Sequence, residues 1–346
     1  MTSLMFSEAA EAAQVVRRQA AVHHDALTRL VEDLRANPPS CVVVCARGSS
    51  DHAGVYGKYL IETLCGVPVA AAAPSVASVY GAVPAAGVGA NVLCLAISQS
   101  GRSPDLLASA LAWRDRGARL VALVNDETSP LALAADVLLP LSAGPEKSVA
   151  ATKSFIAALS AQAALVAAWS EDAALTQALT TLPAQLEAAF ELDWSDALPV
   201  LDGDRSLFVL GRGYGLGVAR EAALKLKETC ALHAEAFSSA EVRHGPMAIV
   251  RDGFPVLAFA GSDAGGDDVA AACAEFAERG AAVALAIAET SETPPAVLRL
   301  PALTAHPAIQ PILQIQSFYR FAETLARRRG LDPDRPAFLK KVTETR

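Results

Sequence analysis

The chain contains a charged segment whose residue types and spacing suit proton transfer. Residues 220–228 read Arg-Glu-Ala-Ala-Leu-Lys-Leu-Lys-Glu, and residues 241–246 read Glu-Val-Arg-His-Gly-Pro. Because an α-helix advances about 100° per residue, Glu221, Lys225 and Glu228 would share one stripe. An ammonium between two carboxylates, with an imidazole in the second segment, can move protons on a carbonyl compound. The other interpretation is an exposed Glu/Lys ladder that only stabilises its helix, which is the commoner use of such spacing.

Composition and charge exclude several classes of protein. Of 346 residues 52% are hydrophobic and 19% charged, so the chain can bury large cores and is long enough for two domains. The net charge of −8, without a basic stripe, and the 5% aromatic content argue against nucleic acid as a partner. No signal peptide and no apolar run of membrane-spanning length is visible, so we expect a cytoplasmic protein without membrane contact. Six cysteines without a Cys-x-x-Cys pair and six scattered histidines predict no metal site.

The sequence repeats itself at long range. Three short segments recur in the same order in the second half, at offsets that drift from 165 to 161 residues. They are 41–49 with 206–214, 113–118 with 276–281, and 135–140 with 296–301. Such matches are common singly but not in series, so the chain is predicted to hold two copies of one unit.

Each copy alternates short apolar runs with amphipathic stretches. The runs predict strands at 42–46, 92–97, 120–124 and 137–139, and at 207–210, 256–260, 282–287 and 297–300. Helices are predicted over 55–64, 105–116, 218–229 and 267–279. This order is typical of an α/β fold with two tandem flavodoxin-like, doubly wound parallel sheets. Ligands of such sheets lie beyond the carboxyl ends of the strands, at the point where the strand order reverses.

The same patterns predict five segments along the chain. Residues 1–34 form a helical lead-in, 35–170 the first unit and 171–204 a helical linker. Residues 205–330 form the second unit with the charged helix, and 331–346 a Pro-punctuated, basic C-terminal tail.

Hydroxyl-rich loops follow two of the predicted strands. Residues 98–105 read Ser-Gln-Ser-Gly-Arg-Ser-Pro-Asp and open a helix, and residues 47–52 read Arg-Gly-Ser-Ser-Asp-His. Hydroxyls, a flexible glycine and free N–H groups at a helix start can bind an anion, although an ordinary capped turn uses the same residues. A third loop, 143–153, follows the last strand of the first copy. Because no dinucleotide or nucleoside-triphosphate motif is present, we expect the ligand to be a phosphate monoester of a small metabolite.

Taken together these motifs resemble the sugar isomerase (SIS) family. The resemblance is to the two-SIS isomerase half of glucosamine-6-phosphate synthase and, more closely, to SIS-type glucosamine-6-phosphate deaminases. The matching pieces span almost the whole chain in the family's order: 47–50, 98–103, 148–153, 221–228, 241–247 and 339–343.

The resemblance implies a role for each matched residue. Glu228 would shuttle a proton between C1 and C2 of the open-chain sugar, and His244, supplied by the neighbouring subunit of a homodimer, would open the ring. Lys340 in the tail would contact the sugar carbonyl, supported by Lys225 and Glu221, and the choice of Lys340 or Lys225 for a Schiff base stays open. The residues implied to bind the substrate are Ser49, Ser50, Ser98, Gln99, Ser100, Ser103, Val149 and Ala150. No cofactor and no metal is implied.

Departures from the synthases favour one reaction. The chain begins Met-Thr-Ser-Leu where the synthases carry a cysteine nucleophile on a glutaminase domain, so glutamine-dependent transfer is not expected. Arg102 stands where the synthases have an acidic residue. Pro104 and Leu339 each stand where the synthases have a small residue. The predicted function is therefore hydrolytic deamination of glucosamine 6-phosphate to fructose 6-phosphate and ammonia in a shared site of a homodimer. The alternatives are an isomerase or deglycase of another phosphorylated amino-sugar or amine-sugar adduct, and a non-catalytic phosphosugar-binding regulator.

Overall fold

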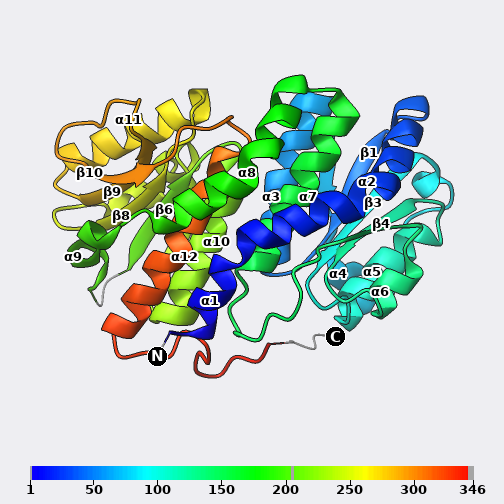
Figure 1. The fold of residues 1–346 in the computed structure, drawn as a ribbon, viewed down its shortest axis with the longest axis horizontal. Coiled ribbons are helices and arrows are strands. Elements are labelled where there is room, and N and C mark those ends of the chain that lie inside the picture. The colour runs from blue at the N-terminus through cyan, green and yellow to red at the C-terminus, as the bar shows by residue number, and fades with distance from the viewer. Residues whose placement is uncertain (1, 204–205, 342–346) are drawn as a thin grey trace. The chain divides into compact units, whose positions relative to one another are not determined.

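A computed structural model describes residues 2–203 and 206–341 of the chain (Figure 1). These residues form two compact units that are not continuous in sequence. We call them the first-sheet unit (14–146, 153–179 and the described residues after 339) and the second-sheet unit (2–13, 147–152 and 180–339). The five predicted segments follow chain order, whereas each of these units is assembled from separate stretches of the chain.

Both sheets have five parallel strands with one topology. The first sheet runs β2-β1-β3-β4-β5 and the second runs β7-β6-β8-β9-β10. Each is the flavodoxin-like order 2-1-3-4-5, so the predicted α/β class and the duplication are confirmed. The strands of the first sheet are β1 Cys41–Cys45, β2 Val69–Ala71, β3 Val92–Ser98, β4 Arg119–Val124 and β5 Val137–Pro140, and those of the second are β6 Leu207–Gly211, β7 Ala234–Ser238, β8 Pro255–Phe259, β9 Ala282–Ala288 and β10 Leu298–Ala302.

Helices cover both faces of the first sheet because its central strands are apolar on both sides. Every residue of β3 is buried, as expected for a central strand of a parallel sheet. Cys45 and Cys94 face the core formed with α5 and α6, whereas Val44 and Ile97 face Gly54 of α3, which packs against α7. The helices are α2 Ala12–Ala36, α3 Ser49–Leu60 with the π-helix η1 Ile61–Cys65, α4 Pro74–Ser78, η2 Val88–Asn91, α5 Pro104–Arg114, α6 Pro130–Ala134 and α7 Lys153–Ser170.

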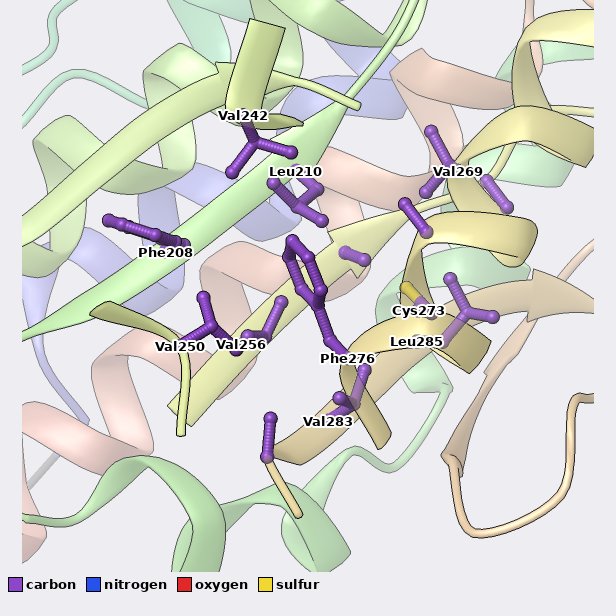
Figure 2. Packing of buried hydrophobic residues seen from close by; sticks show 14 of the residues in the cluster. Phe208, Leu210, Val242, Val250, Val256, Val269, Cys273, Phe276, Val283 and Leu285 are labelled. Carbon is purple, nitrogen blue, oxygen red and sulfur yellow. The ribbon is translucent and has the colours of Figure 1, made fainter. Parts of the chain in front are cut away.

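The second-sheet unit repeats this arrangement. Phe276 of α11 extends toward Leu210 on one face of the sheet (Figure 2). On the other face α10 lies beside α12, and α12 lies beside α1 (Figure 1). The helices are α1 Leu4–Ala10, α8 Ala173–Glu191, η3 Ser195–Ala197, α9 Leu198–Leu201, α10 Gly215–Cys230, η4 Glu241–Arg243, η5 Pro246–Ile249, α11 Ala264–Glu278 and α12 Gln310–Arg328.

Two strands were absent from the sequence-based prediction. Both are edge strands that pair with a single neighbour: β2 has three residues, and β7 carries the exposed Glu235. β2 is too short to stand out as a strand, and Glu235 interrupts the apolar run of β7. The lead-in is two helices, since α1 ends before Glu11 and α2 begins at Ala12. No described helix is both long and apolar enough to cross a membrane.

Candidate functional site

The predicted stripe on α10 is a buried cluster of charges. The Lys225 Nζ lies 3.4 Å from Glu221 Oε1 and also donates a short hydrogen bond to Glu228 Oε2. The Lys225 and Glu221 side chains are 1% and 0% exposed, and that of Glu228 is 21% exposed. An exposed ladder is therefore excluded, and Glu228 is the member of the cluster whose carboxylate solvent can reach.

The charges on the two carboxylates decide the protonation of Lys225. Burial alone would lower its pKa, but attraction by Glu221 and Glu228 outweighs this and raises the pKa above its ordinary value. Lys225 thus stays a cation at neutral pH. A protonated amine cannot attack a carbonyl, so this cation suits the orientation of Glu228 and not Schiff-base formation.

Glu228 lies at the amino edge of the second sheet. Helix α10 follows β6, runs back along the sheet and ends at Cys230, after which Ala231 adopts a left-handed conformation and β7 begins. Glu228 is thus in the last turn of α10, at the opposite end of the helix from the loop that follows β6. Because the 16-residue helix is about 24 Å long, Glu228 lies far from the loop that follows β6.

His244 lies at the other edge of the same sheet. It follows η4 in the connection after β7, is exposed, and its backbone N–H donates to the Glu241 carbonyl at 2.9 Å. Because β7 has five residues, it separates the two edges by about 16 Å. One copy of the second-sheet unit therefore does not bring His244 to Glu228.

Residues 147–152 of the third predicted loop belong to the second-sheet unit. The Glu8 carboxylate of α1 accepts hydrogen bonds from the backbone N–H groups of Lys147 (2.5 Å) and Ser148 (3.1 Å). The Val149 N–H donates to the Asp334 carbonyl at 3.1 Å, and Asp334 also accepts from the first N–H groups of α1.

This loop is tied to the end of α10 through the C-terminal part of the chain. Arg329, at the end of α12, donates to the carbonyl of Cys230, the last residue of α10, at 2.7 Å. Within the second-sheet unit, Val149 and Ala150 are therefore at the amino edge together with Glu228.

In the first-sheet unit the two serine loops lie side by side. They follow β1 and β3, which are paired neighbours at the point where the strand order reverses. Ser49 and Ser50 open α3 behind Gly48, whose φ is +54°. The structure thus brings these serines to the carboxyl edge where Ser98, Gln99, Ser100 and Ser103 also lie.

The loop after β3 is held by its own side chains. The Ser98 hydroxyl accepts from the Gly101 N–H at 3.0 Å, and the Ser100 hydroxyl from the Arg102 N–H at 3.3 Å. Gly101 has a φ of +62°, and a Cβ there would lie 2.2 Å from the Ser129 Oγ, so the turn requires glycine. Ser103 precedes α5 without capping it. Pro104, the first residue of the helix, has no N–H, and the Leu106 N–H donates to Asp105 Oδ1 at 2.8 Å.

The described part of the C-terminal tail carries two adjacent lysines. Lys340 is exposed, and the Lys341 ammonium lies 3.2 Å from an oxygen of the buried Glu146. Val342 and Thr343, the rest of this motif, lie outside the described residues. Among the residues described, no group of three His, Cys, Asp or Glu side chains is placed to hold a metal ion.

Sequence reasoning missed residues that act at these edges through distant partners. Glu8 holds the loop around Ser148, and Asp105 accepts two hydrogen bonds from Arg47. Neither partnership has a local spacing signal, because the partners are 140 and 58 residues apart.

The chain has two flavodoxin-like units, and in one of them hydroxyl-rich loops precede the amino ends of two helices. This arrangement is typical of α/β proteins that bind phosphorylated small molecules. The family is shown by direct comparison. The SIS domain model matches residues 39–168 and 201–311, and the chain belongs to this family.

Individual relatives agree with this assignment. The glutamine–fructose-6-phosphate aminotransferase (isomerizing) of Aeropyrum pernix is 37% identical over 317 residues, which cover 87% of this chain and 50% of that protein. The chain spans about half the length of the curated relatives it matches.

Two solved structures are similar over nearly the whole chain. A candidate phosphosugar isomerase from Silicibacter pomeroyi has 43% identity and a TM-score of 0.90, with 96% of this chain and 100% of the other covered. The C-terminal domain of glucosamine-fructose-6-phosphate aminotransferase from Francisella tularensis has 25% identity and a TM-score of 0.87, with 97% and 99% covered.

Proposed function

We propose that the chain is a SIS-type phosphosugar aldose-ketose isomerase that deaminates glucosamine 6-phosphate, giving fructose 6-phosphate and ammonia with water as the second substrate. The observation that carries this proposal is the buried Lys225 ammonium between two carboxylates on α10, one of which solvent can reach. Membership of the SIS family and the serine loops at the carboxyl edge of the first sheet support it.

The proposed chemistry is a proton transfer followed by hydrolysis. Glu228 removes the proton from C2 of the open-chain aldehyde and returns it to C1, so the C2–N bond becomes an imine. Water adds to the imine carbon, and ammonia leaves as the ketone forms. The serine hydroxyls and helix N–H groups hold the phosphate, and a cation near the carbonyl, for which Lys340 is the candidate, stabilises the enolate.

His244 is proposed to open the sugar ring in the site of a second copy of the chain. This is supported by its place at the opposite edge of the sheet from Glu228 and by its exposure, which leaves the imidazole accessible.

The test follows both products. Purified protein is incubated with glucosamine 6-phosphate while ammonia and fructose 6-phosphate are measured together, and the wild type is expected to release them in equal amounts. Glu228→Gln is expected to lower kcat at least about a hundredfold, the lower range for loss of a general base. Glu278→Gln, which changes an exposed carboxylate at the end of α11, serves as the matched control.

Three results would contradict the proposal. Full turnover by Glu228→Gln would remove the proton shuttle from this residue. Sugar binding without either product would favour a regulator, and interconversion of aldose and ketose phosphates without ammonia would favour an isomerase alone.

A further inference from the structure

We propose that Arg47 is a positioning residue that holds the two serine loops of the first-sheet unit in register and thereby sets the affinity for the phosphate group. This inference rests on the proposed function, because it concerns the phosphate of the same substrate. It assigns to Arg47 no contact with the reacting carbons.

The contact is between a half-exposed cation and a fully buried anion. Arg47 Nε and Nη2 donate to Asp105 Oδ2 at 3.0 and 2.8 Å, and the Leu106 N–H donates to Oδ1 at 2.8 Å. The Asp105 side chain is 0% exposed, whereas that of Arg47 is 49% exposed. Because removal of Arg47 would take the cation from a carboxylate that is buried in the folded chain, the pair is strongly favoured over separated charges.

The two partners stand directly beside the serines of the two loops. Arg47 precedes Gly48, Ser49 and Ser50 in the loop after β1, and Asp105 lies in the first turn of α5, two residues after Ser103. The pair therefore crosses the point at which the strand order reverses. A phosphate that contacts both loops would depend on their separation, and the rigid guanidinium fork fixes that separation better than a flexible ammonium would.

An equivalent pair exists in the second copy. Arg212 directly follows β6 and donates to Asp268 of α11, the helix after β8, at 2.8 Å. The second loop reads Gly-Tyr-Gly after the arginine and lacks the adjacent serines. The arginine–aspartate pair thus recurs where the strand order reverses in both sheets, but only the first copy places hydroxyls beside it.

The first-sheet unit also supplies a matched control. Arg102 lies in the loop after β3 and is likewise 49% exposed, and its Nε and Nη2 donate to Asp126 Oδ2 at 3.0 and 2.7 Å. Asp126 is 35% exposed and follows β4, so this pair does not join the two serine loops. Arg102→Met removes the same charge from the same neighbourhood without removing the link between those loops.

The experiment compares Arg47→Met, Arg47→Lys and Arg102→Met. Titration calorimetry gives Kd for inorganic phosphate and for glucitol 6-phosphate, an inert open-chain analogue, and kinetics give kcat and KM for glucosamine 6-phosphate. We expect both Arg47 variants to raise Kd and KM about tenfold, the equivalent of one lost charge-assisted contact, with kcat within about twofold of the wild type. Arg102→Met is expected to change Kd and KM less than about twofold.

Other results would overturn the inference. Normal affinity in Arg47→Lys, or an equal loss in Arg102→Met, would show that charge and not position matters. A fall in kcat at unchanged KM would place Arg47 in the chemical step. Circular dichroism checks folding, and if Arg47→Met does not fold, Arg47→Lys alone decides between normal and weakened affinity.

Failure of the proposed function is distinguishable from failure of this inference. If the wild type binds inorganic phosphate and glucitol 6-phosphate but releases no ammonia, deamination is refuted. The comparison of Kd between the variants still tests the positioning role of Arg47. A wild type that binds neither phosphate refutes the phosphate site, and the role of Arg47 with it.

Discussion

At the scale of single residues, Lys225 has the most constrained environment of the proposed catalytic set. Its ammonium forms an ion pair with the Glu221 carboxylate, and both side chains are almost fully buried. Charges in such a place are tolerated because each satisfies the other, so removal of one partner leaves an uncompensated buried charge. This predicts a large effect of substitution on stability, separate from any effect on turnover.

Lys225→Met is therefore expected to lower the free energy of unfolding by about 3–5 kcal/mol. The double variant Glu221→Gln/Lys225→Met removes both buried charges and is expected to recover a large part of that loss. Urea denaturation measures both variants. A single variant no less stable than the double variant would show that Glu221 is not held by Lys225.

At the scale of elements, α1 stabilises a loop far from it in sequence. The buried Glu8 carboxylate receives two backbone N–H groups of the loop that carries Val149. Charge-assisted hydrogen bonds of this kind are stronger than neutral ones, so the loop depends on one side chain of the lead-in.

Glu8→Gln is expected to loosen this loop, because an amide NH₂ cannot accept a hydrogen bond from a backbone N–H. Faster hydrogen exchange is expected at the amides of 147–152 and unchanged exchange in the buried strand β8, which serves as the internal control. Unchanged exchange in the loop would mean that Glu8 does not hold it.

A second link joins three elements around Asp268. Its carboxylate accepts from Arg212 after β6, from Ser239 after β7 and from Arg243, which directly precedes His244. Partial burial alone would raise the pKa of Asp268, but the Ser239 hydrogen bond and the two arginines outweigh this and lower it below the ordinary value of an aspartate.

The lowered pKa of Asp268 predicts the pH at which this link fails. A carboxyl whose pKa is depressed by folding stabilises the folded state above its unfolded pKa, and that contribution is lost as pH falls through the folded value. The stability difference between wild type and Asp268→Asn should therefore be constant near neutral pH and shrink at acidic pH, as pH falls through the lowered pKa of Asp268. Melting temperatures of both proteins across acidic pH measure this stability difference. A difference that grows as pH falls would show that folding does not lower the pKa of Asp268.

At the scale of the whole molecule, the duplication has led to different uses of the two copies. Both sheets keep the same topology and an arginine–aspartate pair where the strand order reverses. The first keeps the serine loops, whereas the second carries the charged stripe of α10 and the exposed His244. Because Glu228 and His244 lie at opposite edges of one sheet, we propose that the site combines Glu228 of one chain with His244 of a second chain.

Mixed variants test this sharing. Glu228→Gln and His244→Ala are each expected to be inactive, and co-refolding them should restore activity in heterodimers with one intact site. Random pairing would give about a quarter of the wild-type number of sites in a two-fold symmetric dimer. Each variant refolded alone is the control. No recovery in the mixture would mean that both residues serve one site of the same chain.

Local patterns in the sequence determined most of the fold. Central strands such as Val92–Ser98 are continuous apolar runs because a parallel strand is buried on both faces, and the repeat offsets identified the second copy. The Glu221, Lys225 and Glu228 stripe was equally predictable, since helical spacing is a local property. The edge strand β2 was missed because it has only three residues, and β7 because Glu235 interrupts its apolar run.

Only the tertiary structure decided which distant groups meet. Arg47 with Asp105, Glu8 with Ser148 and Asp334 with Val149 are pairings that no local spacing encodes. The two carboxylates that raise the pKa of the buried Lys225, and the opposite edges taken by Glu228 and His244, likewise arise from packing. Secondary structure follows from neighbours along the chain, whereas electrostatics and proximity follow from neighbours in space, and these became visible only once the chain was folded.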